Sequence, residues 1–355
     1  MLELTHPKRS SGHAQYGADR RPGLSRALVT GGSGFIGQYL VSALLARGHF
    51  VRVLDPSPPA DPWAEVDHVA GSILDPAVVL RALAGIDCVY HLAGIPHLWT
   101  ARRGDFDLVN RQGTEMMLSA AVAQRITRFV HCSSEATLFG PRNGRDMIDE
   151  TVSLDLHDMA GPYSRSKLGA EQAALAAADQ GLNVVVVNPT IPVGPGDRNH
   201  TPPTAMLLHF MAGGSFFLNC TMNLVDVRDV ATGMILAAER GRVGERYILG
   251  GENIPLAQLL NAVTRGARRS VSVPGPVALA AAGLSEWIAT NVTHRMPVAT
   301  VEGVRLALRS GALDSGKAQR ELGYLPHAIA EALSETTAWL CGVRGAPSLL
   351  PQPVS

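Results

Sequence analysis

Charge is scarce in this sequence and evenly balanced. Only 17% of the 355 residues are charged, against roughly 25% in an average soluble protein. Lysine and arginine together number 31, as do aspartate and glutamate, so the formal net charge is zero. Proteins that bind nucleic acid need a basic face, and this composition gives no sign of one. We therefore expect no nucleic-acid partner, and the length allows one large domain or two.

Cysteines are few and lie far apart. The four cysteines, Cys88, Cys132, Cys220 and Cys341, form no C-x-x-C pair. This spacing is neither that of a zinc site nor that of a disulfide framework. We therefore expect no bound metal and a reducing compartment.

Long apolar runs are also missing. The most apolar stretch, residues 271–289, is interrupted by two prolines and by Glu286, which argues against a membrane-spanning helix. Residues 1–23 are polar and lack the apolar core of a secretory signal. We expect residues 1–23 to be a disordered extension and the protein to be cytoplasmic.

Short apolar segments alternate with helical patterns through the first half of the chain. Strands are expected at 24–30, 50–54, 86–92, 128–133 and 183–188, and helices at 35–47, 75–84, 106–124 and 163–180. This alternation is typical of βαβ units around a parallel sheet. Four consecutive valines at 184–187 suit a strand that is buried on both faces. The sequence predicts an α/β fold with a Rossmann-type, doubly wound parallel sheet.

A glycine-rich segment, TGGSGFIG at 30–37, joins the first expected strand to the first expected helix. Gly31, Gly34 and Gly37 permit a tight turn and let a pyrophosphate approach the backbone closely. The helix N-terminus then offers unpaired N–H groups to the phosphates. An ordinary turn is the alternative, but the strand before and the helix after favour a dinucleotide site.

Asp55 ends the second expected strand, 18 residues after Gly37. A carboxylate at this place accepts hydrogen bonds from both ribose hydroxyls of NAD and repels the 2′-phosphate of NADP. Two alternatives stay open: Asp55 starts a turn before Pro56, or Arg52 of the same strand accommodates NADP. We predict NAD as the cofactor, with NADP as the alternative.

The alternation loosens after Pro189 and defines the predicted domains. The NAD(P)-binding domain comprises residues 24–190 with about 224–250, and a smaller, mainly C-terminal substrate cap comprises 191–223 with 251–345. Residues 346–355 are expected to be a flexible tail.

Tyr163 and Lys167 stand in a YxxxK spacing at the start of an expected helix. Residues four apart share one helix face, so the phenol and the ammonium can point into one site. A nearby ammonium stabilises a phenolate and lowers its pKa. Tyr163 is therefore a candidate acid or base for a carbonyl/alcohol pair, and the alternative is a solvated helix face.

Together these motifs resemble the extended short-chain dehydrogenase/reductase family, of the NAD-dependent epimerase/dehydratase type, over residues 24–340. The collinear motifs are TGGSGFIG (30–37), HLAG (91–94), VNRQGT (109–114), YSRSK (163–167), NPTIPVGPGD (188–197), NLVDVRDVATG (223–233), GERYILGGENI (244–254) and DSGKAQRELGYLP (314–326). Within the family the chain most resembles the branch of hopanoid-associated epimerase-like, dihydroflavonol-reductase-like and 3-beta-hydroxysteroid-dehydrogenase-like proteins.

The resemblance implies roles for individual residues. Tyr163 is the catalytic acid/base, and Lys167 holds the nicotinamide ribose and lowers the pKa of the tyrosine. Asn110 supports the loop after the fourth strand, or alternatively caps a helix. The implied cofactor-binding residues are Gly31, Gly34, Phe35, Ile36, Gly37, Asp55, Ser72, Ile73, Leu92, Ala93, Gly94, Asn110, Tyr163, Lys167, Pro189 and Thr190.

The sequence departs from the family pattern at two places. Ser72-Ile73 stands where the family carries Asp-hydrophobic, which predicts a weaker contact with adenine. The catalytic Ser or Thr falls on Ser134 when counted along the strand and on Glu135 when counted back from Gly140. A hydroxyl can donate to a ketone oxygen, whereas an ionised carboxylate opposes alkoxide charge. We therefore assign the role to Ser134, with Ser133 as a structural neighbour.

The cap composition bears on the substrate. Residues 199–223 contain no Lys or Arg but many large apolar residues, Met206 to Leu218 among them. Cations are needed to bind a nucleotide-sugar diphosphate, so this stretch favours an apolar wall beside the substrate. The alternative is that these side chains pack the core of the cap, and Arg142 and Arg228 remain candidates to reach a phosphate.

Three functions are therefore open. The first is reduction or oxidation of a ketone/secondary alcohol on a hydrophobic, lipid-like molecule of the sterol, triterpenoid or sphingolipid type. The second is a nucleotide-sugar epimerase or dehydratase with tightly bound NAD, and the third is a non-catalytic dinucleotide-binding protein.

Two contacts with other partners are also predicted. The apolar stretch 277–288, with Trp287, is either a packed cap helix or a helix that rests on the cytoplasmic face of a membrane. By analogy with the family we expect a homodimer through the helices at 106–123 and 163–180.

Overall fold

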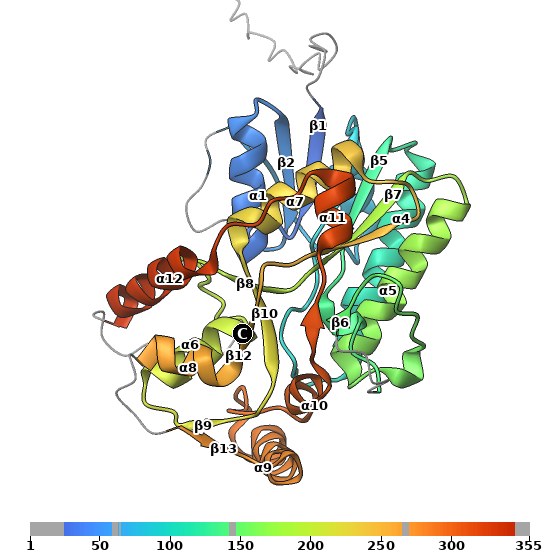
Figure 1. Ribbon diagram of the computed structural model, residues 1–355. Coiled ribbons are helices and arrows are strands. Elements are labelled where there is room, and N and C mark those ends of the chain that lie inside the picture. Colours follow the sequence, from blue (N-terminus) through green and yellow to red (C-terminus); the bar gives the residue numbers. More distant parts are fainter. Residues whose placement is uncertain (1–24, 59–62, 64, 142–146, 265–269, 345–355) are drawn as a thin grey trace, which may run out of the picture.

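The computed structural model describes residues 25–58, 63, 65–141, 147–264 and 270–344 (Figure 1). The predicted extension at 1–23, the predicted tail at 346–355 and Arg142 lie outside the described residues. The strands are β1 (Arg26–Thr30), β2 (Phe50–Asp55), β3 (Asp67–Ala70), β4 (Cys88–His91), β5 (Arg128–Cys132), β6 (Met147–Ile148), β7 (Val184–Pro189), β8 (Ile191–Val193), β9 (Phe216–Phe217), β10 (Thr221–Asp226), β11 (Arg246–Leu249), β12 (Glu252–Pro255), β13 (Val271–Ser272) and β14 (Ala312–Leu313). The α-helices are α1 (Phe35–Ala46), α2 (Pro76–Leu83), α3 (Gly104–Phe106), α4 (Gly113–Ala123), α5 (Pro162–Asp179), α6 (Pro202–Met211), α7 (Val227–Arg240), α8 (Leu256–Thr264), α9 (Gly275–Ile288), α10 (Val301–Arg309), α11 (Gly316–Leu322) and α12 (Ile329–Arg344).

The main sheet has seven parallel strands in the order β11-β7-β5-β4-β1-β2-β3. The chain winds outward from β1 in one direction to β3 and then from β4 in the other direction to β11. The strand order thus reverses between β1 and β4, where the carboxyl ends of parallel strands leave a crevice for a ligand. The predicted Rossmann-type, doubly wound α/β fold is confirmed.

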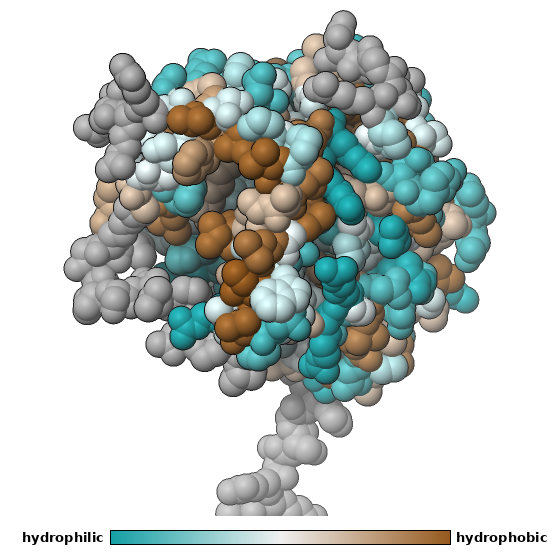
Figure 2. Space-filling model, turned by 90° about the horizontal axis from the view of Figure 1, so that it is seen from below, coloured by the Kyte–Doolittle hydropathy of each residue, from teal (hydrophilic) through white to brown (hydrophobic). Residues whose placement is uncertain are grey.

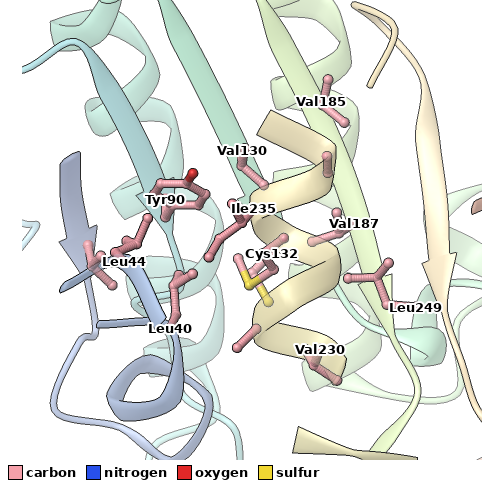
Figure 3. Close-up of a cluster of buried hydrophobic side chains, with 14 of the residues drawn as sticks. Leu40, Leu44, Tyr90, Val130, Cys132, Val185, Val187, Val230, Ile235 and Leu249 are labelled. Carbon is pink, nitrogen blue, oxygen red and sulfur yellow. The ribbon is translucent and has the colours of Figure 1, made fainter. Parts of the chain in front are cut away.

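Both faces of the sheet are buried, as the four-valine run predicts. Val185 and Val187 of β7 join one apolar core with α1, α7 and α11 (Figure 3). Val184 and Val186 face the opposite way into a second core with α2, α4 and α5. Successive side chains of a strand point to opposite faces, and full burial of one valine stabilises the fold by about 1.5–3 kcal/mol.

The cap is built from small sheets and from helices of the C-terminal part. The strands β12, β10 and β8 form one sheet, β13 pairs with β9, and β14 pairs with β6. An apolar core lies between α6, α8, α12 and this three-stranded sheet. One segment that we predicted as cap differs: Ala318, Leu322 and Tyr324 pack into the core of the nucleotide-binding half.

The apolar residues of α6 fill the cap core and do not form the apolar wall that we expected beside the substrate. Leu207 and Phe210 are buried among residues of α8 and α12, and Met206, Leu208 and Met211 pack against them. The helices α8 and α12 supply other apolar residues of the same core. Most of the apolar residues in the stretch without Lys or Arg therefore pack the core of the cap, whereas Phe216 is exposed.

Within the described part of the chain, no helix is both long and apolar enough to span a bilayer.

Candidate active site

The loop between β1 and α1 has a shape that only glycine allows at two positions. Gly31 has a φ of +70°, and a Cβ there would lie 2.9 Å from the backbone nitrogen of Ala93. A Cβ at Gly37 would collide with the carbonyl oxygen of Gly31. The loop therefore presents bare backbone at the carboxyl ends of β1 and β4, as close approach of a pyrophosphate requires.

The N-terminus of α1 follows this loop directly. Gly34 is its N-cap, no side chain caps the helix, and the first turn contains no acidic residue. Phe35 and Ile36 open the helix, and Phe35 is buried with its ring edge against Tyr39. The first N–H groups and the positive end of the helix dipole are thus left for an anion. This arrangement fits the phosphates of a dinucleotide.

Asp55 lies at the carboxyl end of β2, beside the glycine loop. Its Oδ2 accepts a hydrogen bond from the N–H of Ser33 at 3.2 Å, and its Oδ1 accepts one from the N–H of Ser57 at 3.0 Å. Arg52 is held elsewhere: its guanidinium pairs with Asp67 at 2.7 Å and donates to carbonyl oxygens at the end of α2. The carboxylate thus lies beside the glycine loop, where we predict the ribose, whereas the guanidinium of Arg52 is held by Asp67 and by α2.

Ser72 and Ile73 follow β3 on the same edge of the sheet, where Gly71 donates its N–H to the carbonyl oxygen of Asp55. Ser72 is exposed, and its hydroxyl accepts the N–H of Leu74 at 3.1 Å. Ile73 is buried, and its Cδ1 lies 2.6 Å from where a Cβ on Gly113 would stand. The serine thus borders the predicted adenine side, while the isoleucine packs against the start of α4.

Asn110 ties the loop after β4 to the helix that carries Tyr163. Its Oδ1 accepts the N–H of Ile95 at 2.7 Å, and its Nδ2 donates to the hydroxyl of Ser166 at 3.0 Å. The residue is buried in a π-helical turn between α3 and α4, a feature found often at functional sites. A Cβ on Gly94 would lie 2.9 Å from Asn110 Oδ1, so this loop and the asparagine are in close contact.

The residues that precede Gly94 in that loop are held by hydrogen bonds to Thr30 at the end of β1. Leu92 donates its N–H to the carbonyl oxygen of Thr30, and Ala93 donates its N–H to the hydroxyl of the same threonine, both at 3.1 Å. His91 also contacts this hydroxyl through Nδ1 at 2.7 Å, and burial lowers the pKa of His91 to about 3. A neutral imidazole thus supports the loop that we predict to line the cofactor.

Tyr163 is the second residue of α5, and its ring meets Phe106 edge-on with centroids 6.1 Å apart. Ser134 lies beside the phenol, since a hydrogen bond between the two side chains lowers the pKa of Tyr163. Burial outweighs this effect and raises that pKa to about 12. The phenol is thus protonated at neutral pH, with a hydroxyl beside it.

Lys167 lies one turn further along α5 and is buried. Its ammonium donates a 2.6 Å hydrogen bond to the carbonyl oxygen of Cys132, and burial lowers its pKa. The pKa of Tyr163 is raised overall, so the lowering by Lys167 that we predict is smaller than the effect of burial. Burial of the phenol raises its pKa, and Ser134 is the side chain whose hydrogen bond opposes that rise.

Glu135 begins the short helix that follows Ser134. Its Oε2 is buried and makes no hydrogen bond within the described residues, and burial raises the pKa of this carboxyl to about 8. The carboxyl is therefore largely protonated at neutral pH, in contrast to the ionised carboxylate that the sequence argument assumes. The sequence could not predict this protonation state, because it depends on how deeply the folded chain buries the carboxyl.

Ser133 belongs to a buried polar network that we did not predict beyond calling it a structural neighbour. Its hydroxyl donates to Glu171 Oε2 at 2.5 Å, and Thr137 and Asn188 donate to the same oxygen at 3.0 and 2.9 Å. Arg246 pairs with the other oxygen of Glu171 at 2.9 Å. The network joins the segment that follows β5 to β7, β11 and α5.

Pro189 ends β7, and Thr190 follows it with its N–H donating to Leu249 at 3.2 Å. Both are buried at the carboxyl edge of the sheet. They thus lie on the edge that also holds the glycine loop, Asp55 and Ser134, where we predict the nicotinamide end to pass.

Glu302 is the site residue that sequence reasoning missed. It lies on the cap helix α10, is 3% exposed, and accepts hydrogen bonds from the N–H groups of Tyr163 and Ser164 at 2.9 and 2.7 Å. The N-cap of α5, Gly161, has no side chain to fill this role, and a Cβ there would lie 2.5 Å from Glu302 Oε2. The capping glycine indicates that a partner is needed, but not which residue supplies it.

A cavity of about 150 Å³ lies next to the start of α5. Apolar residues dominate one side of it, among them Trp99, Phe106 and Pro162. Two acids, Glu286 and Glu302, and two cations, Arg103 and Arg305, also border the cavity. A space with apolar and charged walls thus lies at the start of α5, bounded by the nucleotide-binding half and by the cap.

Comparison with known proteins agrees with this geometry. The family described as NAD dependent epimerase/dehydratase family matches residues 27–250. The putative dihydroflavonol 4-reductase of Synechocystis sp. is 34% identical over 88% of this chain and 93% of its own. A 4-hydroxy-2-methyl-3-oxo-4-farnesyl-3,4-dihydroquinoline-1-oxide ketoreductase of Stigmatella aurantiaca is 35% identical over 84% of this chain and 91% of its own. Sterol demethylase protein B of Methylococcus capsulatus is 30% identical over 88% and 97%.

Solved structures show the same architecture. The crystal structure of gox2253 superposes with a TM-score of 0.77 at 32% identity and covers 90% of this chain and 99% of its own. The dTDP-glucose 4,6-dehydratase DesIV of Streptomyces venezuelae, with NAD bound, gives a TM-score of 0.72 at 26% identity over 90% and 98%. The chain is therefore an NAD(P)-dependent oxidoreductase that belongs to the NAD-dependent epimerase/dehydratase family, a group of extended short-chain dehydrogenases/reductases.

Proposed function

We propose that this protein interconverts a ketone and a secondary alcohol on a hydrophobic, lipid-like molecule, with NAD as the preferred dinucleotide. The observation that carries the proposal is the pair of Tyr163 and Ser134 on the helix start and loop next to a cavity that Trp99, Phe106 and Pro162 line. Two hydroxyl donors at one place suit a carbonyl oxygen that gains negative charge. Two relatives are named for comparable substrates, a farnesylated quinoline oxide and a sterol.

In this mechanism the side chains handle the proton and the position of the substrate. Bound NAD(P)H supplies the hydride. Ser134 donates a hydrogen bond to the substrate carbonyl oxygen and so stabilises the developing alkoxide. Tyr163, protonated at neutral pH, gives its proton to that oxygen. Lys167 holds the nicotinamide ribose through its ammonium, which also stabilises the phenolate that remains.

The glycine loop and Asp55 hold the other end of the dinucleotide. Gly31, Gly34 and Gly37 leave space for the pyrophosphate at the N-terminus of α1. Asp55 accepts the ribose hydroxyls, and Arg52 is already held by Asp67, which supports the preference for NAD over NADP.

The alternative, a nucleotide-sugar epimerase or dehydratase, is favoured by the likeness to DesIV. A diphosphate needs cations, and the candidate Arg228 is held by Asp226 at 2.6 Å and by Glu335 at 3.0 Å. Arg103 and Arg305 border the cavity, but Arg103 pairs with Glu286 and Arg305 donates to the carbonyl oxygen of Ala160. These pairings weigh toward the lipid-like substrate.

NADH oxidation measured with a panel of hydrophobic ketones and of nucleotide-sugars tests the proposal. We expect turnover with a sterol or terpenoid ketone and a loss of about 10²–10⁴-fold in the Tyr163→Phe variant, with NADH binding kept. Release of stoichiometric NAD⁺ on denaturation, together with nucleotide-sugar turnover and inert ketones, would establish the alternative instead.

A further inference from the structure

Helix α9 is apolar along its length and yet barely packed. Among its 14 residues only Glu286 is charged and only Ala282 is buried. A helix that is apolar on all sides is normally enclosed by a protein core or by lipid. In this fold α9 lies at the end of the cap, and α10 is the long helix that it mainly packs against (Figure 1).

The exposed side of this helix continues into the segment after it. We define the α9 face by its six large exposed apolar side chains, which are Val277, Leu284, Trp287, Ile288, Val292 and Met296. Leu284 is 61% exposed and Trp287 is 59% exposed. Figure 2 views the molecule from this end and shows apolar residues gathered in a band. Contiguous apolar surface of this kind marks a docking site.

The exposed charged residues within 271–300 have one sign. Glu286 points inward, where it accepts the N–H of Val301 at 2.7 Å and pairs with Arg103 at 3.3 Å. No other acidic residue occurs between 271 and 300, whereas His294 and Arg295 are exposed at the edge of the face. An apolar centre with a basic edge is complementary to an anionic lipid surface.

We propose that the α9 face docks on an anionic lipid bilayer, with Leu284 and Trp287 in the boundary between headgroups and acyl chains and Arg295 among the headgroups. Tryptophan is enriched at that depth because its ring is apolar with one polar N–H. The docking is peripheral and reversible.

A second copy of the chain fits this face less well. In a two-fold contact each residue meets the same patch on the partner. Arg295 would then need a carboxylate on that patch, and Glu286, the one acid of the segment, is turned inward. The homodimer that we predict uses helices α4 and α5, on another side of the molecule (Figure 1).

The position of the face connects it to the site. Glu286 of α9 caps the start of α10 through Val301, and Glu302 of α10 caps the start of α5 through Tyr163. The cavity beside Tyr163 is bordered by Glu286 and Val301. A lipid-like substrate taken up at this end would reach the cavity along the cap, a consequence that rests on the proposed function, whereas the docking itself does not.

Flotation of the full chain with vesicles tests the docking. The vesicles contain phosphatidylcholine with or without phosphatidylglycerol. We expect the protein to float with the anionic vesicles at low salt, and Leu284→Glu/Trp287→Glu to lower its partitioning by about tenfold or more because two apolar anchors are lost. Arg295→Glu should weaken binding to anionic vesicles and leave binding to neutral ones unchanged.

The matched control is Val243→Glu, which places the same charge on another exposed apolar residue, in the loop before β11. It should float like the parent protein, and NADH binding by each variant confirms that the fold is intact. If the parent protein stays unbound at low salt, or if all variants float alike, the docking proposal is wrong.

Two further readouts separate this proposal from its rivals. If Leu284→Glu turns a dimer into a monomer by analytical ultracentrifugation and the parent protein does not float, the face is an interface between copies and the proposal fails. If the protein floats but reduces no ketone, docking stands and the proposed function fails. If the protein reduces a ketone but does not float, the proposed function stands and the docking proposal fails.

Discussion

The carboxylate of Glu302, on the cap helix α10, accepts a 2.9 Å hydrogen bond from the backbone N–H of Tyr163. The same side chain bonds both the N–H and the hydroxyl of Ser164 at 2.7 Å. Because these contacts cap the N-terminus of α5, the cap fixes the helix that carries the proton donor. The negative charge also raises the pKa of the Tyr163 phenol.

Replacement of Glu302 should therefore change both stability and the ionisation of Tyr163. Glu302→Ala removes a helix cap and is expected to lower the free energy of unfolding by about 1–2 kcal/mol, measured by urea denaturation. Glu302→Gln keeps an acceptor oxygen but not the charge, so we expect a smaller loss of stability. In both variants the pKa of Tyr163 falls, and the alkaline limb of the pH–rate profile moves to lower pH.

Glu331→Gln provides the matched control, because Glu331 is an exposed acid in the first turn of another cap helix, α12. It should change neither the stability nor the pH profile. A pH profile that is unaltered in Glu302→Gln would show that this residue is structural only.

The parts of this protein that could be predicted depend on residues close together in the chain. The strand–glycine–helix pattern around Gly31 and the i, i+4 spacing of Tyr163 and Lys167 record local geometry, and the alternation of strands and helices fixed the sheet. The doubly wound fold follows from these patterns because buried strands must be covered on both faces.

The features that could not be predicted arise from contacts between distant segments. Glu302 and Tyr163 are 139 positions apart, and no spacing rule connects them. The same limit applies to Met206 and Leu208, whose apolar character is equally suited to a substrate wall and to the cap core that they pack against. The protonation state of Glu135 likewise depends on its burial in the fold, and burial of a single glutamate cannot be predicted from composition.

Asp55 should determine the choice between NADH and NADPH. Asp55→Ala removes the carboxylate that we assign to the ribose hydroxyls, and the loss of these charge-assisted hydrogen bonds is expected to weaken NADH binding by about 10- to 100-fold. NADPH should gain relative to NADH because the repulsion of its 2′-phosphate is removed. Fluorescence titration of both cofactors measures the two affinities.

Asp179→Ala is the control for this titration, since Asp179 is an exposed acid at the far end of α5. Its affinities should equal those of the parent protein. Equal or tighter binding of NADPH than of NADH by the unaltered protein would overturn the role given to Asp55.

Ser134 should act on turnover and on the pKa of Tyr163 together. Ser134→Ala removes a donor to the substrate oxygen, and we expect kcat to fall by about 10²–10³-fold. It also removes the hydrogen bond that lowers the pKa of Tyr163, so that pKa should rise. The pH dependence of alcohol oxidation, in which Tyr163 is the base, would then shift to higher pH.

The neighbouring position supplies the comparison for this variant. Glu135→Gln replaces a carboxyl that is largely protonated at neutral pH by a neutral amide, so near-normal turnover at that pH is expected. Near-normal turnover in Ser134→Ala together with an inactive Glu135→Ala variant would place Glu135 in the catalytic position instead.

Glu135 should also make stability depend on pH in a defined window. Burial raises the pKa of its carboxyl from 4.5 to about 8 in the folded protein, so between these values the folded chain binds a proton that the unfolded chain releases. The contribution of this group to the free energy of unfolding is then complete below pH 4.5 and is lost as the pH rises toward 8.

Urea denaturation across this range should show the parent protein losing stability relative to Glu135→Gln, which cannot ionise. Because Glu150 and Glu302, whose pKa values burial also raises, are present in both proteins, the difference between the two curves isolates Glu135. Parallel curves would mean that the Glu135 carboxyl ionises at its ordinary pKa and is open to water.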